Sequence, residues 1–518
     1  MPKITIDGKT VEVAEGTSIL KAAGQAGIHI PHLCYHPAFP PEGSCRLCLV
    51  EVEGVQKLEL SCSTVVREGM VVRTQSEKVK EARRSVLEFL LAEHPLDCPI
   101  CDKAGECKLQ DYYEAYGLFE GGFRETKEKR SKLVPIGKRL ILDRERCILC
   151  TRCVRFLQEV TGTGELGVFE RGLHSEIGIY EGEPVDNNYS GNLAEICPVG
   201  AITDTDFRFK TRSWFLESRP SICPLCSRGC NIVIEAHRGF PRVELKQRVY
   251  RVRSRENLAI NQYWICDLGR YAYKYLDENR VTYPFQVSDG QKVRLSWDKV
   301  FIILSEKIRG LQVRKRTERI ALLLTTALTN EEFFLIRRLF LEELKVSRYA
   351  FSDPAPEKGD NLLLTPERTP NRRGAKALGF DVEAKAENFS GEKIDLLLIF
   401  ASHLPEAMPL AWLQAEAAKI ETKVLFTCQE SKIEAVMDFV LPVAPVAEKE
   451  GSLTNIDGKT QSFSAGLPLW GESLPEWKVL VELAKQAKVN FRYFSLLDSV
   501  QVINEAMAQE SSILGQNP

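Results

Sequence analysis

The sequence lacks any apolar stretch long enough to cross a membrane. Its longest apolar runs, such as Ile320–Leu324 and Leu396–Ala401, are far shorter than the roughly 20 residues that a membrane helix needs. The sequence also lacks a large excess of positive or negative charge, because the formal net charge is only −2 over 518 residues. Nothing global therefore indicates nucleic acid or an anionic membrane as a partner. The chain opens with a strand and turn rather than a signal peptide. These absences favour a cytoplasmic protein that reaches a membrane only through partners.

Cysteine, in contrast, is plentiful. Sixteen cysteines at short spacings, in a chain without an export signal, indicate metal binding rather than disulfides. Fifteen of them and one histidine form four sets of four. The first set is Cys34, Cys45, Cys48 and Cys62; the second is His94, Cys98, Cys101 and Cys107; the third is Cys147, Cys150, Cys153 and Cys197; the fourth is Cys223, Cys226, Cys230 and Cys266. An iron–sulfur cluster needs about four protein ligands, so the pattern predicts a multi-cluster electron conduit. We expect the remaining cysteine, Cys428, to be a small buried residue without a metal role.

The first set has the plant-type ferredoxin arrangement of a [2Fe–2S] cluster, with a longer first gap. Three ligands lie on one loop, and Cys62 comes from a following segment. Gly43 beside Cys45 would let backbone N–H groups approach the cluster sulfurs. We interpret His32 and His36, which flank Cys34, as loop residues or hydrogen-bond donors around the site. The alternative is a structural zinc site, although zinc ribbons normally use two Cys-x2-Cys pairs.

The second set contains the most unusual ligand, His94. A lone histidine at a helix end is more often a cap or a packed surface residue. Here three cysteines need a fourth ligand and no spare cysteine lies nearby in the sequence, so we predict that His94 binds a [4Fe–4S] cluster. Imidazole is neutral where thiolate is anionic, which taken alone should raise the cluster potential.

The third and fourth sets both suit [4Fe–4S] clusters. The third has the bacterial Cys-x2-Cys-x2-Cys spacing with a distant Cys197-Pro198 partner. A two-cluster ferredoxin would place another cysteine at position 157, which is leucine, so one cluster is expected here. In the fourth set Cys266 follows Cys230 after a long gap, and zinc is again the alternative.

Hydrophobic periodicity predicts an α+β chain of several domains. A hairpin over residues 3–14 and a helix over 17–26 indicate a small β-grasp domain, and residues 76–94 are expected to form a helix that delivers His94. Beyond Trp297 strands and helices alternate, which predicts a parallel sheet with crossover helices. The predicted elements there are helices at 297–311, 330–344 and 410–420, and strands at 320–325, 396–401 and 423–427. The predicted domains are 1–75 ([2Fe–2S] ferredoxin-like), 76–135 (a [4Fe–4S] domain with one histidine and three cysteine ligands), 136–215 ([4Fe–4S] ferredoxin-like, α-rich), 216–285 (a further [4Fe–4S] domain), 286–500 (α/β) and 501–518 (a polar tail).

With all four sets in this order, the chain resembles the large iron–sulfur subunit, known as the G subunit, of bacterial respiratory complex I. The segments that carry the resemblance are Cys34–Glu51, His94–Cys107, Cys147–Arg155, Glu195–Ala201 and Trp264–Arg270. Residues 438–459 also resemble a segment of the molybdopterin-oxidoreductase fold. The resemblance implies that residues 216–285 are the [4Fe–4S] domain of that fold and that 286–500 are its shortened α/β part.

The resemblance also implies a function and partners. Electrons would come from a flavoprotein subunit that binds FMN and oxidises NADH, and would leave through a two-[4Fe–4S] ferredoxin-like subunit towards quinone. Further partners would be a small [2Fe–2S] subunit and the rest of the peripheral arm. No nicotinamide fingerprint is evident in this chain, so NADH and flavin are placed on a partner, and no catalytic residue is expected here. The alternatives are an electron-input subunit of a soluble NAD-coupled hydrogenase, formate dehydrogenase or bifurcating complex, and a zinc-stabilised scaffold.

Molybdenum is not expected. In molybdenum enzymes of this type, the segment that begins at the fourth cysteine ligand resembles Cys-x-Lys-Gly-Arg, with the lysine between cluster and pterin. This chain has Cys266-Asp-Leu268-Gly-Arg270, and Leu268 offers neither charge nor donors. No cysteine between Cys266 and Cys428 is available to bind the metal.

Overall fold

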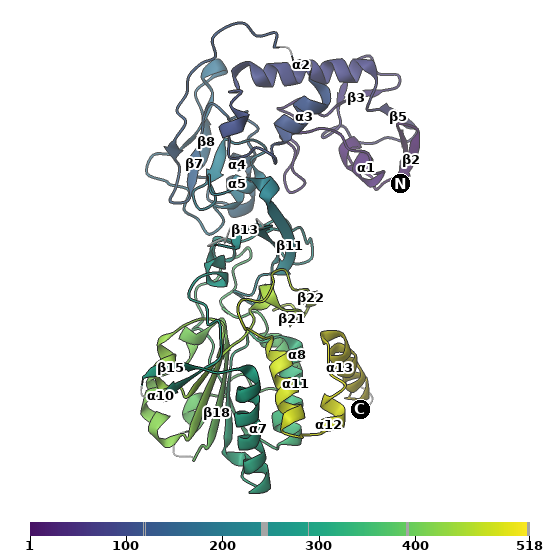
Figure 1. Cartoon of the computed structure of the whole chain (residues 1–518). Coiled ribbons are helices and arrows are strands. Elements are labelled where there is room, and N and C mark those ends of the chain that lie inside the picture. The colour runs from purple at the N-terminus through teal and green to yellow at the C-terminus, as the bar shows by residue number, and fades with distance from the viewer. Residues whose placement is uncertain (118, 120, 240–246, 289, 390–392, 515–518) are drawn as a thin grey trace. The chain divides into compact units, whose positions relative to one another are not determined.

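The computed structural model describes residues 1–117, 119, 121–239, 247–288, 290–389 and 393–514. The chain divides into two compact units, Met1–Leu216 and Glu217–Pro518 (Figure 1). Among the described residues, no helix combines the length and the apolar character needed to span a membrane. Residues 515–518 of the expected tail lie outside the described residues.

The first unit begins with a five-stranded sheet on which one helix packs. Its strands are β1 (Lys3–Ile6), β2 (Lys9–Glu12), β3 (Leu49–Val52), β4 (Glu59–Leu60) and β5 (Met70–Arg73), in the order β2-β1-β5-β3-β4. The predicted hairpin is confirmed, since β1 pairs with β2 antiparallel around Asp7 and Gly8. Helix α1 (Ile19–Gln25) begins at Ser18, whose hydroxyl accepts the Lys21 N–H. Its apolar face packs against the sheet and closes a small core.

A long helix carries the chain from this sheet to the second set. Helix α2 (Glu77–Glu93) is capped by Ser76, whose side chain accepts the Val79 N–H. It ends at His94, where the backbone turns extended. Inside the unit, the buried Arg83 of α2 donates to the Tyr116 hydroxyl and to the Leu49 carbonyl. This arginine ties the helix to α3 (Lys108–Tyr116) and to β3, and the prediction of a helix that leads to His94 is confirmed.

The rest of the first unit consists of short elements around the third set. They are β6 (Val134–Pro135), β7 (Leu140–Leu142), α4 (Arg152–Arg155), β8 (Leu166–Phe169), β9 (Glu176–Ile179), α5 (Asn192–Ile196) and β10 (Ile202–Asp204). Strands β10, β7 and β6 form one sheet, and β8 pairs with β9. Such short elements bury few apolar residues by themselves, so the cysteine loops form much of the interior here.

The second unit begins with a three-stranded sheet and a short helix around the fourth set. The strands are β11 (Leu216–Ile222), β12 (Asn231–His237) and β13 (Val249–Ser254), followed by α6 (Asp267–Tyr271). Residues 240–246, within the fourth-set domain predicted at 216–285, lie outside the described residues. A ribbon of β21 (Gly451–Thr454) and β22 (Thr460–Phe463) lies later in the chain, and the Asn231 amide donates to the Gln461 side-chain oxygen.

A mixed seven-stranded sheet forms the centre of the second unit. Its strands are β14 (Phe285–Ser288), β15 (Gln291–Arg294), β16 (Ile320–Leu324), β17 (Arg348–Phe351), β18 (Leu396–Ser402), β19 (Thr422–Thr427) and β20 (Phe439–Pro442), in the order β15-β14-β20-β19-β18-β16-β17. Strands β16 to β20 are parallel, and β14 and β15 form an antiparallel edge. Strands β16 and β18 are buried throughout, as expected of parallel strands covered on both faces.

Helices cover both faces of this sheet (Figure 1). One core contains residues of α7 (Trp297–Val313), α8 (Asn330–Ile336), α11 (Glu476–Gln486) and α13 (Val500–Leu514). The other contains Leu413 of α10 (Leu410–Glu416). The remaining short helices are α9 (Arg372–Ala377) and α12 (Phe491–Phe494). The predicted α/β alternation is confirmed, whereas the tail prediction was wrong for residues 501–514, because α13 is helical and buries Ile503 in the core.

Candidate metal centres

The first set lies in the loops around β3 and β4. Cys34, Cys45, Cys48 and Cys62 are all buried. The backbone N–H groups of Leu33 and Cys34 point to the Cys45 sulfur, at 3.4 and 3.5 Å. Gly43 has φ +70°, the left-handed conformation that glycine adopts without strain, so the loop turns back just before Cys45. Backbone donors aimed at a ligand sulfur are the contacts that stabilise a reduced cluster.

The four thiols of this set act on one another in pairs. A hydrogen bond from the Cys45 thiol lowers the pKa of Cys34 to about 5. A hydrogen bond from the Cys48 thiol likewise lowers the pKa of Cys62. The donors show the reverse, since the same bonds and burial raise the pKa of Cys45 and of Cys48. The loops therefore bring these sulfurs together two by two, and in each pair the hydrogen bond lowers the pKa of the accepting thiol.

The second set surrounds the junction of α2 and α3. His94 caps the end of α2, Cys98 begins a 3₁₀ turn (Cys98–Ile100), and Cys107 caps the start of α3. Burial lowers the pKa of His94 to about 4, so the imidazole is neutral, which is the form that binds metal. Its Nδ1 is buried without a hydrogen-bond partner. The charged neighbours with the largest effect on it are Arg146 and Asp97. The His94 backbone ends the helix, but its neutral ring, with a buried Nδ1 that has no hydrogen-bond partner, fits a metal ligand.

The third set lines a single cavity. Cys147, Cys150, Cys153 and Cys197 form its wall together with apolar side chains that include Leu142 and Val199. Leu149 and Thr151 both have positive φ, +50° and +57°, which wraps the loop tightly. The Leu149 N–H points to the Cys147 sulfur at 3.5 Å. Burial raises the pKa of Cys147 to about 12 and that of Cys150 to about 11. Thiols whose pKa is raised in this way need a positively charged centre to deprotonate them, so the donor set fits a cluster.

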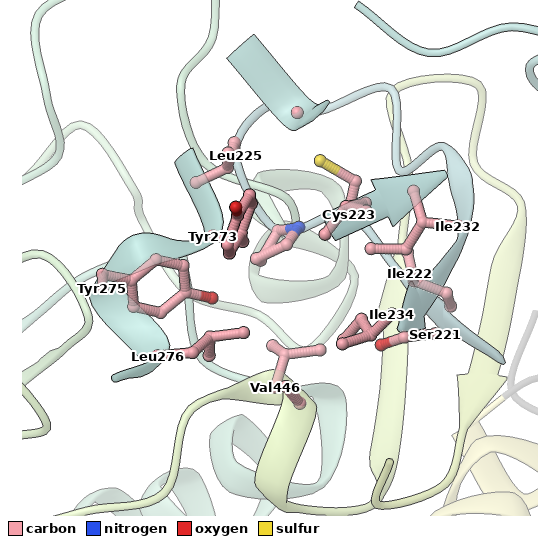
Figure 2. Close-up of a pocket in the computed structure, with 14 residues that line it drawn as sticks. Ser221, Ile222, Cys223, Leu225, Ile232, Ile234, Tyr273, Tyr275, Leu276 and Val446 are labelled. Atoms are coloured by element: carbon pink, nitrogen blue, oxygen red, sulfur yellow. The ribbon is translucent and has the colours of Figure 1, made fainter. Parts of the chain in front are cut away.

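The fourth set lies between β11, β12 and α6 in the second unit. Cys223, Cys226, Cys230 and Cys266 are all buried. The Gly269 N–H points to the Cys266 sulfur at 3.4 Å. Figure 2 shows Cys223 beside a cavity whose other walls are mainly apolar, with Leu225, Ile232 and Val446 among them and the Tyr275 hydroxyl directed inward. This apolar surrounding would keep water away from a bound cluster on that side.

The described residues contain no group of three or more His, Cys, Asp or Glu side chains that could hold a metal ion directly between them.

The other residues considered from the sequence lie outside these sets of sulfurs. His32 Nδ1 lies 2.8 Å from the Ile30 carbonyl, and His36 Nδ1 accepts the Ala38 N–H. Cys428 is completely buried, and its carbonyl accepts from the Arg280 side chain. Burial raises the pKa of the Cys428 thiol to about 12. Leu268 is on α6 and is 41% exposed.

Some residues at the sites carry no spacing signal in the sequence. Gly200 is one of them, because a Cβ there would lie 2.3 Å from the Cys101 sulfur. The loop after Cys197 therefore lies directly against the second set. Arg152 and Arg155 of α4 are two more, since they hold backbone carbonyls of the first and third sets. The sequence hint was only that two arginines flank Cys153 at a position where a ferredoxin helix should be buried.

Family models match five segments of the chain. They are described as a 2Fe-2S iron-sulfur cluster binding domain (residues 2–77), the NADH-ubiquinone oxidoreductase-G iron-sulfur binding region (83–121), the ferredoxin-like domain of NADH-quinone oxidoreductase subunit 3 (137–203), the molybdopterin oxidoreductase Fe4S4 domain (216–278) and molybdopterin oxidoreductase (371–486). The G subunit of the NADH-quinone oxidoreductase of Streptomyces coelicolor is 41% identical over 318 residues, 61% of this chain and 36% of that protein. The G 2 subunit of the Rhizobium meliloti enzyme is 38% identical over 473 residues, 90% of this chain and 52% of that protein.

The chain belongs to the G-subunit family of NADH-quinone oxidoreductases. The predicted fold class is confirmed, with a [2Fe–2S] ferredoxin domain first, [4Fe–4S] domains next and a molybdopterin-oxidoreductase-like domain last. NADH-quinone oxidoreductase subunit 3 of Thermus thermophilus is 37% identical over 374 residues, and this match covers 65% of this chain and 46% of the Thermus protein. The chain thus spans about half the length, or less, of these curated relatives. A solved NAD+-reducing [NiFe]-hydrogenase is 35% identical over 40% of this chain and 90% of its own, with a TM-score of 0.38.

Proposed function

We propose that this member of the G-subunit family carries electrons from an NADH-oxidising flavoprotein subunit towards quinone in a complex I type dehydrogenase. The clusters would be one [2Fe–2S] at the first set and a [4Fe–4S] at each of the other three, held by the sixteen residues named above. Each cluster would accept and release one electron at a time. The chain itself would supply the insulated path and the spacing, and no bond chemistry.

The arrangement of the first three sets is the observation that supports a conduit. Arg155 donates to the carbonyls of Cys34 and Cys150, which belong to the first and third sets. Gly200, three residues after Cys197, lies against the Cys101 sulfur of the second set. The third set therefore lies between the other two. We infer that, with clusters bound, an electron that passes between the first and second sets would travel through the third, an order that differs from the order in the sequence.

The remaining assignments follow from the same proposal. The partners would be the FMN-containing flavoprotein, the small [2Fe–2S] subunit, the two-[4Fe–4S] subunit and other peripheral-arm subunits, with the chain in the cytoplasm at the inner membrane. The fourth set would stand off the main line. The α/β part of the second unit would serve as a platform for neighbouring subunits. It would hold no molybdenum, because the exposed Leu268 stands where a lysine would bridge cluster and pterin.

Purification of the native complex tests this proposal. Mass spectrometry should identify the flavoprotein and membrane proton-pump subunits together with this chain, and NADH should reduce its clusters in that complex. The chain purified alone should neither bind NADH tightly nor reduce ferricyanide with it. A complex with hydrogenase subunits, or NADH oxidation by a flavin-free preparation of the chain, would contradict the assignment.

A further inference from the structure

Two arginines of α4 are buried between the first and third sets. Arg152 is 5% exposed and Arg155 is 6% exposed. Both flank Cys153, so the same helix turn that provides a ligand also provides two guanidinium groups. Arginine is almost never buried to this degree without a partner that compensates its charge.

Arg155 joins the two sets through backbone carbonyls. Its Nη2 donates to the Cys34 carbonyl at 2.6 Å and to the Cys150 carbonyl at 3.3 Å. Its Nη1 donates to the Pro40 carbonyl at 3.0 Å, which lies in the loop between Cys34 and Cys45. The planar guanidinium holds its donors in a fixed fork, so these bonds set the separation of the two loops.

Arg152 makes a second bridge of the same kind. It donates to the carbonyl of Tyr35, next to Cys34, and to the carbonyl of Ile196, next to Cys197. Three ligand-bearing backbone segments, those of Cys34, Cys150 and Cys197, are thus held by two side chains. Both bridges lie within the first unit. The contacts to Tyr35 and Cys34 connect residues that are more than one hundred positions apart along the chain.

Neither guanidinium forms an ion pair with a carboxylate among the described residues. All of the acceptors found for them are carbonyls or the Thr151 hydroxyl. Since a buried cation needs a countercharge, the sulfur ligands on both sides are the anionic groups available to provide it.

We propose that Arg152 and Arg155 are positioning residues that fix the spacing of the first and third clusters and balance their negative charge. The inference rests on the proposed function. If clusters occupy both sets, one electron would pass between them, and no proton or bond would change. The two guanidinium groups, held by carbonyls of both ligand loops, would then favour the reduced form of each cluster.

Redox titrations of the full complex, followed by electron paramagnetic resonance, test this. Arg152→Gln and Arg155→Gln remove the charge but keep a donor, and each should shift the reduction equilibria of the first and third clusters at least tenfold towards the oxidised form. Tenfold corresponds to about 59 mV for one electron. Arg152→Lys and Arg155→Lys keep the charge and should restore the potentials to within about threefold, although the fork is lost.

Arg212→Gln is the matched control. Arg212 also donates to two carbonyls, those of Pro99 and Cys101, but in the loop of the second set. Its replacement should leave the potentials of the first and third clusters unchanged. Equal behaviour of the Gln and Lys variants, either unchanged potentials or equal loss of clusters, would overturn the proposal. Clusters that are present in the Lys variants but lost in the Gln variants would support it. Iron analysis separates these results from failure of the proposed function, which would leave even the unaltered chain without clusters.

Discussion

The Lys449 ammonium donates to the Glu476 carboxylate at 2.7 Å, and both side chains are completely buried. A second carboxylate, from Glu332, accepts from the same ammonium at 2.6 Å. One cation therefore faces two acids at the buried start of α8 and α11. Burial, reinforced by the Glu332 charge, raises the pKa of Glu476 to about 8.

This raised pKa predicts a pH dependence of stability. The folded chain holds the Glu476 proton up to about pH 8, whereas the unfolded chain releases it near the ordinary value of about 4.5. The contribution to stability is thus fully present below about pH 4.5 and is lost progressively as pH rises to about 8. Glu476→Gln should flatten the fall in melting temperature between about pH 5 and 8, measured by calorimetry. Glu450→Gln, at an exposed position, serves as control and should keep the original slope.

His94→Ala should remove the second cluster and leave the other three. The reason is that the second cluster would keep only its three cysteine ligands, whereas each of the other clusters would keep all four ligands. Paramagnetic resonance of the reduced protein measures this directly. His174→Ala, at an exposed histidine of the same unit, should leave every signal in place. An unchanged second-cluster signal in His94→Ala would remove His94 from the ligands.

Iron analysis under anaerobic conditions should find about 14 iron atoms per chain, as one two-iron and three four-iron clusters require. Visible absorbance typical of iron–sulfur proteins should accompany the iron. Stoichiometric zinc, or about half that iron, would contradict the assignment of four clusters.

The same samples should contain no stoichiometric molybdenum or tungsten. Leu268 has no donor for a pterin, and it occupies the position of the bridging lysine. Near-stoichiometric metal of either kind, or formate oxidation that is lost on substitution in the second unit, would overturn the metal-free assignment.

The sequence predicted elements well where one local signal determines them. Helix α2 begins after Ser76 and ends at His94, and the side-chain cap at its start is marked by a single serine in the sequence. The buried runs at β16 and β18 were equally clear, since strands covered on both faces are apolar throughout. Each cysteine set was recognisable because cluster ligands lie at short spacings, although their roles as ligands stay predictions.

Features that depend on the tertiary structure could not be predicted in this way. Arg155 binds carbonyls, and a carbonyl is present at every residue, so no pattern marks its acceptors. Gly200 has an ordinary negative φ, and only the Cys101 sulfur beside it explains why a side chain is excluded. The helix of α13 was missed because its polar C-terminal residues hide the few apolar ones, such as Ile503, that anchor it to the core.

The position of Cys197 has a consequence for the stability of the first unit. Its three companions lie close together in the sequence, but Cys197 follows at the end of α5, after the β8 and β9 ribbon along the chain. A cluster bound by all four would therefore cross-link the two ends of the long loop between Val154 and Ile196, and would lower the entropy of the unfolded chain in the way that a cross-link does.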